Sequence, residues 1–159
     1  MSKLNFAVSR LVNPQGASPV LTEAQVWHGL QLKVRSPGEF VPVITSCEIL
    51  SDEGDKVSRL VGFRDGVTAR EEVEEYQGAI AYFDSQTMGT RITNVLSYNE
   101  DNEMVLTFSF AGGVPGYNVS SASESSSRPS VKEMNETVGP AVEGTIRRIR
   151  ELVRDGRIV

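Results

Sequence analysis

The fold is decided by the stretch SVKEMNETVGPAVEGTIRRIRELVRDG, residues 130–156. Ser130 and Glu133 form a capping-box pattern at its start, and Gly156 is a typical helix stop. The stretch therefore predicts one amphipathic helix, about 40 Å long at ~1.5 Å per residue, which needs a broad apolar surface to lie on. The stripe recurs every three or four positions, at the apolar residues Val131, Met134, Val138, Val142, Ile149 and Leu152, with Thr145 filling the place between Val142 and Ile149.

The preceding residues supply such a surface. Residues 3–12 alternate apolar and polar side chains, as a half-buried strand does. A second capping box at Thr22 and Gln25 opens a helix that reaches about Arg35, and residues 39–42 form either a turn or one short helical turn. From residue 43 onward the period is two, and short turns such as Asp65-Gly66 predict antiparallel hairpins. Further strands are expected at residues 43–50, 56–64, 67–76, 79–84, 90–98 and 103–111.

Length and charge exclude several classes of protein. The 159 residues predict a single domain over 1–159, with a flexible Gly/Ser-rich loop at about 112–130. A net charge of -5 argues against binding nucleic acid, and no apolar run is long enough for integral membrane association. The single cysteine, Cys47, and the N-terminal composition predict a cytoplasmic protein. Monomer and dimer both stay open.

Particular stretches carry a family resemblance: LNFAVSR at residues 4–10, FVPVITSC at 40–47 and ITNV at 92–95. These stretches, and the order of the expected elements, resemble a domain-of-unknown-function branch of the START and Bet v 1-like (SRPBCC) superfamily. The resemblance implies an α+β helix-grip fold, in which a seven-stranded curved antiparallel sheet wraps around the long C-terminal helix and encloses a cavity. Members of the superfamily include lipid carriers, hormone receptors and polyketide cyclases.

Residues for metal or nucleotide chemistry are missing from the sequence. His28 is the only histidine and falls away from the apolar stripe of its helix, formed by Val26, Leu30 and Val34, so it is expected to face solvent. Cys47 has no histidine near it in the sequence and is expected to be buried and inert. The glycine-rich residues 112–116 lack the lysine of a phosphate-binding loop. No metal and no cofactor are therefore expected.

One strand carries large apolar residues at alternate positions, from Met104 to Phe110. Its apolar face is expected to look toward the long helix, either as packed core or as the wall of a cavity. With the resemblance, this favours a partner that is a hydrophobic or aromatic small molecule, bound between sheet and helix. The expected ligand-binding residues are Trp27, Asn94, Leu106, Phe108, Phe110, Met134, Val138 and Val142.

Polar residues interrupt several of the apolar rows. Glu71, Arg59 and Asn94 each lie between apolar residues of the same register, and Arg59 could pair with Glu71 on the neighbouring strand. Such residues either meet a ligand in a cavity or are outward-facing or internally satisfied. The rival hypothesis is a cofactor-independent cyclase, isomerase or dehydratase for a polyketide-like or alkaloid-like substrate. Glu71 would be its base, and Arg59 or a cavity tyrosine, Tyr82, would stabilise developing negative charge. A third alternative is a protein-interaction module with a filled interior.

Overall fold

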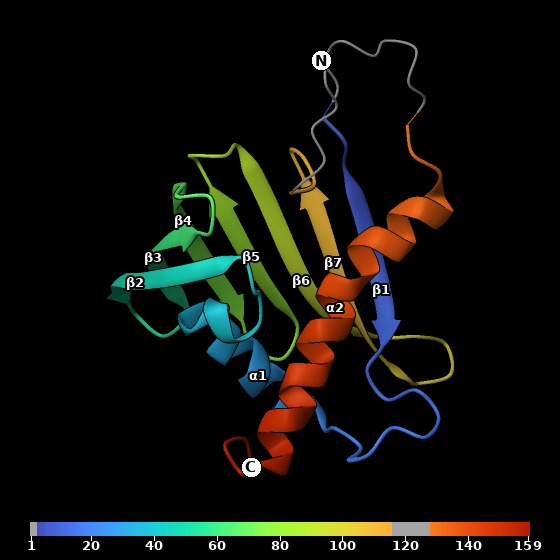
Figure 1. The fold of residues 1–159 in the computed structure, drawn as a ribbon. Coiled ribbons are helices and arrows are strands. Elements are labelled where there is room, and N and C mark those ends of the chain that lie inside the picture. The colour runs from blue at the N-terminus through green and yellow to red at the C-terminus, as the bar shows by residue number, and fades with distance from the viewer. Residues whose placement is uncertain (1–2, 116–127) are drawn as a thin grey trace.

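The computed structural model describes residues 3–115 and 128–159 and shows an antiparallel sheet whose concave side carries the helices (Figure 1). The strand order is β1-β7-β6-β5-β4-β3-β2. The predicted α+β class, with a seven-stranded antiparallel sheet and a long C-terminal helix, is confirmed. Most of the loop predicted at 112–130 lies outside the described residues. The elements are β1 (Phe6–Leu11), α1 (Glu23–Arg35), the short 3-10 helix η1 (Pro37–Glu39), β2 (Ile44–Asp52), β3 (Lys56–Phe63), β4 (Thr68–Tyr76), β5 (Ile80–Ser85), β6 (Thr90–Tyr98), β7 (Met104–Ala111) and α2 (Val131–Arg154).

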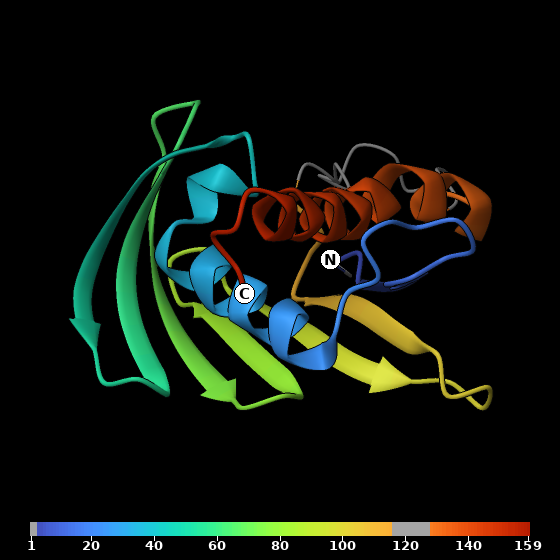
Figure 2. The same ribbon diagram turned by 90° about the horizontal axis from the view of Figure 1, so that it is seen from below.

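The two α-helices divide the concave face of the sheet between them. α2 contacts β1, β7 and α1, so it covers one end of the sheet. α1 lies in the hollow of the sheet beside α2 (Figure 2). The last turn of α1 crosses the sheet, because Lys33 donates to Asn94 on β6 and receives a hydrogen bond from Arg59 on β3 at its carbonyl. Much of the central position that the sequence predicts for the long helix is therefore taken by α1.

The apolar stripe of α2 lies against β1, β7 and α1, apart from its first residue. Both predicted capping boxes are present, at Thr22 and at Ser130. Val131 is 73% exposed, because the first turn of α2 projects past the edge of the sheet (Figure 1). Ile146, which the predicted stripe leaves out, is buried with the others. A second, smaller apolar cluster lies under the last turn of α1 and consists of Val34, Val57, Val73, Ala81 and Phe83.

The two helices touch at a position that has no side chain. A Cβ atom on Gly29 of α1 would lie 2.4 Å from Cγ1 and 2.6 Å from Cδ1 of Ile149 on α2. These separations are far below the ~3.5–4.0 Å of a carbon–carbon contact. Ile149 is fully buried and has little room to move away. The absence of a side chain at residue 29 therefore sets the spacing between α1 and α2.

Gly29→Ala is expected to lower the free energy of unfolding by about 1–3 kcal/mol, because overpacking outweighs the helix propensity that alanine adds. Gly144→Ala is the matched control within α2, since a Cβ there would meet only Nη2 of Arg147, at 3.6 Å. The control should stabilise by up to about 1 kcal/mol. Urea unfolding measures both, and equal stabilisation of the two variants would contradict the close packing at Gly29.

Candidate functional site

A cluster of polar side chains lies in the interior, where α1 ends above the sheet. Lys33 on α1, Arg59 on β3, Glu71 on β4 and Asn94 on β6 are all buried. The three strand residues share the concave face, because alternate positions of a strand point to the same side of the sheet. These four residues are termed the interior polar cluster. Buried polar and charged side chains need partners, so the contacts of each one decide what the cluster can do.

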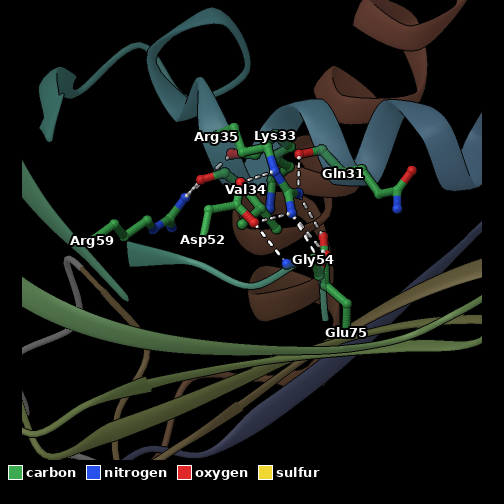
Figure 3. Close-up of polar contacts among 8 residues, drawn as sticks. All are labelled: Gln31, Lys33, Val34, Arg35, Asp52, Gly54, Arg59 and Glu75. Carbon is green, nitrogen blue, oxygen red and sulfur yellow. Dashed lines mark hydrogen bonds and ion pairs between the residues drawn. The ribbon is translucent and has the colours of Figure 1, made fainter. Parts of the chain in front are cut away.

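Arg59 and Glu71 form a buried ion pair between direct cross-strand partners. Nε and Nη2 of Arg59 donate to Oε1 of Glu71, at 3.0 and 2.7 Å, which confirms the predicted pairing. Nη1 of Arg59 also donates to the carbonyls of Lys33 and Val34, as Figure 3 shows. These carbonyls belong to the last turn of α1, which has no intrahelical donors for them. Arg59 therefore joins the end of the helix to the sheet.

Arg35 fixes the same end of α1 from the other side. Its guanidinium donates to Asp52 at 2.8 Å, to Glu75 at 3.0 Å and to the carbonyl of Gly54 at 3.0 Å. Figure 3 shows these groups converging on Arg35 from the β2–β3 turn and from β4. Charge-assisted bonds of this kind are stronger than neutral ones. The last turn of α1, and Lys33 within it, is thus held between two arginines.

Lys33 lies in an environment of aromatic rings and one amide. Its Nζ donates to Oδ1 of Asn94 at 3.1 Å and lies 5.0 and 4.7 Å from the ring centroids of Phe83 and Phe108. Burial lowers the pKa of Lys33 from 10.5 to about 7; the charge of Arg59 also lowers it, and Glu71 acts in the opposite direction. A large share of Lys33 is therefore the uncharged amine at neutral pH, which is the form that can accept a proton.

Asn94 is fully buried and only half satisfied. Its Oδ1 accepts from Lys33, while its Nδ2 has no hydrogen-bond partner in the part of the chain that is described. The amide presents its oxygen to Lys33, which is the donor of this hydrogen bond, and its NH2 group is left over. A buried unsatisfied donor costs about 1–3 kcal/mol. The amide nitrogen is therefore a ready partner for an oxygen atom of a ligand.

The predicted ligand-binding residues lie mostly in the main core. Leu106, Met134 and Val142 have no exposed surface, so no open space adjoins them in this structure. Trp27 is also buried, and its Nε1 has no partner among residues 3–115 and 128–159. The ring of Phe108 faces Lys33 and so joins the core to the interior polar cluster, of which the predicted residue Asn94 is itself a member. Phe110 and Val138 are buried without such a link, and ligand binding by this set stays a prediction.

The structure does not bring Tyr82 to Glu71 and Arg59. Tyr82 alternates with Ala81 and Phe83, which are buried on the concave side, so its ring lies on the convex face. There it packs edge-to-face on Tyr76, with centroids 5.8 Å apart, and under Arg91 at 5.1 Å. The prediction of Tyr82 as a cavity tyrosine is therefore wrong, because alternation along β5 directs its side chain away from the concave face.

Lys33 is the residue of the cluster that sequence reasoning misses. It lies three positions after Leu30 and seven after Val26, on the same helical face as the apolar stripe of α1. Lysine is almost never fully buried without a partner, so a lysine within such a stripe is the signal that could have identified it.

His28 and Cys47 do not belong to the interior polar cluster. His28 is exposed on α1, as predicted. Cys47 on β2 is only half-buried. The pKa of its thiol is raised, mainly by burial; the charge of Arg59 lowers this pKa and that of Glu71 raises it. The raised pKa keeps the thiol in its protonated, unreactive form. No group of three potential metal ligands occurs among the described residues. In the same residues, neither α-helix combines the length and hydropathy that a membrane span requires.

A surface pocket of about 370 Å³ lies at the β5–β6 turn, and its lining contains none of the four residues of the interior polar cluster. It is lined by residues of the β5–β6 turn and the end of β7, among them Ser85 and Gly112. Ser85 is buried and lies directly across from Glu71 in the sheet. Gly112 has a φ of +86°, and a Cβ there would lie 2.3 Å from the carbonyl oxygen of Gly89. The pocket therefore depends on a close backbone approach that only glycine permits.

Arg59→Met is expected to lower the free energy of unfolding by about 3–5 kcal/mol, since it leaves Glu71 as an uncompensated buried charge. Arg70→Met is the control, because Arg70 pairs with Glu72 at 3.0 Å while its side chain is 62% exposed. The control should cost less than about 1 kcal/mol. Chemical denaturation distinguishes them, and equal losses would show that the buried pair does not anchor α1.

The stability difference between the wild type and Lys33→Met is expected to depend on pH. With a pKa of about 7 in the folded state and 10.5 in the unfolded state, the unfolded chain binds more protons at residue 33 between these values. Wild-type stability relative to the variant should therefore rise as pH increases from 7 to 10.5, and its gain should be lost as pH falls toward 7. The ionised groups that act on Lys33 are Arg59 from β3 and Glu71 from β4.

Urea titrations across this pH range measure the effect, with Lys132→Met, whose side chain is 83% exposed, as the control. A constant difference between the wild type and Lys33→Met from pH 7 to 10.5 would contradict a lowered pKa for Lys33.

Comparison with solved structures confirms the predicted helix-grip fold. The di-domain aromatase/cyclase StfQ of the steffimycin pathway has a TM-score of 0.62 and 11% identity, and the match covers 96% of this chain and 51% of that one. The Zhui aromatase/cyclase from Streptomyces sp. R1128 has a TM-score of 0.55 and 13% identity, with 98% of both chains covered. Ara h 8.0201 has a TM-score of 0.52 and 14% identity, with 96% of this chain and 98% of that chain covered.

These likenesses are too distant in sequence to show more than the fold. The chain spans about half the length of StfQ, which contains two domains. No curated protein sequence matches the chain. The family described as "AtaL: Acetylaranotin biosynthesis cluster protein L" matches residues 6–156. Since this match includes the whole sheet and both α-helices, the chain belongs to the AtaL family.

Proposed function

We propose that this protein binds a hydrophobic or aromatic small molecule in its interior, between the concave face of the sheet and α1 and α2. The observation that carries the proposal is the interior polar cluster beside Phe83 and Phe108. Ligand pockets are mostly apolar and contain a few convergent polar groups that orient the ligand, and the cluster has that composition. The solved structures with the same fold include polyketide aromatase/cyclases, which supports a small molecule with aromatic or polyketide character.

Binding in this position requires the interior to open. Asn94 and Leu106 have no exposed surface, so a ligand reaches them only if side chains or a helix move away from the sheet. Such opening selects a minor conformation. The apparent affinity is then the affinity of the open form multiplied by the fraction of molecules that are open. We propose that the opening starts at the pocket of the β5–β6 turn, because Ser85, one of its lining residues, is the cross-strand partner of Glu71.

A second function is favoured by the chemistry of the same cluster. In this alternative the protein is a cofactor-independent cyclase, isomerase or dehydratase for a polyketide-like or alkaloid-like substrate. Glu71 receives both Arg59 bonds on Oε1, and among the described residues no donor bonds its Oε2, which is therefore available to take a proton. Arg59 and the NH2 group of Asn94 would stabilise the oxyanion that forms, and uncharged Lys33 would serve as a second base.

Native mass spectrometry and thermal-shift screening against lipids, aromatic polyketides and terpenoids test the binding proposal. A ligand that binds the folded state raises the melting temperature, and the rise should grow with ligand concentration. Phe108→Ala is expected to abolish the shift, whereas Arg70→Met on the convex face should leave it unchanged. The absence of any retained or stabilising compound would contradict the proposal and favour an interaction module with a filled interior.

Incubation of a stabilising compound with the protein distinguishes binding from catalysis. A chemical change that the wild type produces and Glu71→Gln does not would establish the enzyme. Recovery of the compound unchanged from both proteins, with undiminished binding, would reject the catalytic alternative and leave the binding protein.

A further inference from the structure

The charges of the interior polar cluster do not balance. Glu71 is the carboxylate of the cluster, and Arg59 engages it through two hydrogen bonds to one oxygen. In the described part of the chain no carboxylate lies within ion-pair distance of Nζ of Lys33. When Lys33 is protonated, the cluster therefore carries one positive charge in excess. A buried ion without a counter-charge is costly, and the lowered pKa of Lys33 shows that cost.

The hydrogen-bonding capacity of Lys33 is also incomplete. An ammonium group has three N–H donors, and the hydrogen bond recorded for Nζ among the described residues goes to Asn94. The rings of Phe83 and Phe108 provide cation–π contacts at 5.0 and 4.7 Å, which stabilise a charge without neutralising it. Two groups of the site thus lack an oxygen acceptor, the amine of Lys33 and the unpartnered NH2 group of Asn94. Protonated Lys33 also lacks a negative charge beside it.

From this juxtaposition we infer that the ligand carries an acidic oxygen group, such as a carboxylate, a phenol or an enol, which binds between Lys33 and Asn94. The inference rests on the proposed function and specifies its ligand class. Nζ of Lys33 and Nδ2 of Asn94 would both donate to this group. The rings of Phe83 and Phe108 would contact an aromatic or unsaturated body attached to it, since both rings already border Nζ.

An acid suits this site better than a neutral carbonyl compound for a physical reason. A neutral acid can enter the apolar interior and transfer its proton to the uncharged amine of Lys33. The O–H bond of the ligand breaks and an N–H bond forms, so the site gains an ion pair without taking a net charge from water. Binding of a ligand that is already ionised in solution instead draws one proton from solution onto Lys33. A purely structural role for Lys33 would leave the NH2 group of Asn94 unexplained.

Matched acid and amide probes test the inference with the full chain. The pair is 2-naphthoic acid and 2-naphthamide, which share a ring system and differ in the acidic group. Wild type is expected to bind the acid about tenfold or more tightly than the amide, as charged hydrogen bonds predict. Lys33→Met should lose this preference while still binding the amide, and Arg70→Met should behave as wild type does. Further acid and amide pairs are made from any compound that the ligand screen identifies.

A second measurement needs no variant. Calorimetry of the naphthoate complex at pH 8, in buffers with different ionisation enthalpies, should show uptake of up to one proton per ligand bound. An acid preference that survives in Lys33→Met, or binding without proton uptake, would overturn the inference. If only ligands without an acidic oxygen bind, the inference fails and the proposed function stands. If no compound in the screen binds, both fail.

Discussion

The arrangement of the interior depends on Arg59. Its guanidinium holds Glu71 across the β3–β4 pair and at the same time bonds the carbonyls of Lys33 and Val34 at the end of α1. A helix end buried without donors would be unfavourable, so this one side chain allows α1 to terminate inside the sheet. The position of α1 in turn carries Lys33 to Asn94 and between the rings of Phe83 and Phe108.

Much of the fold follows from local patterns in the sequence. The capping boxes at Thr22 and Ser130 mark the helix starts that the structure shows, and the alternation from residue 43 onward marks the strands within a few residues. Short turns leave antiparallel pairing as the simple solution. What local pattern does not contain is the division of the concave face between α1 and α2. That division depends on tertiary contacts such as Gly29 against Ile149.

The candidate site was only partly predictable for a related reason. Alternation marks Arg59, Glu71 and Asn94 as candidates for the inner face, because they lie between regular apolar positions, but it leaves an outward-facing or internally satisfied role open. The prediction of Tyr82 as a cavity residue is wrong because a tyrosine is compatible with either side of a sheet, and only the pairing of β5 settles the parity. Lys33 lies on a helix, so alternation along a strand does not apply to it. Whether its side chain is buried depends on how deeply α1 enters the hollow of the sheet. Helix depth is a property of packing and not of sequence period.

We propose that the interior polar cluster is a ligand site with a proton-accepting lysine. Nitrogen-15 NMR of the lysine side chains measures this most directly, by following Nζ of Lys33 through a pH titration with and without 2-naphthoate. We expect a midpoint near 7 in the free protein, which moves upward when the acid binds. A midpoint close to that of an exposed lysine, unchanged by any aromatic acid, would contradict it.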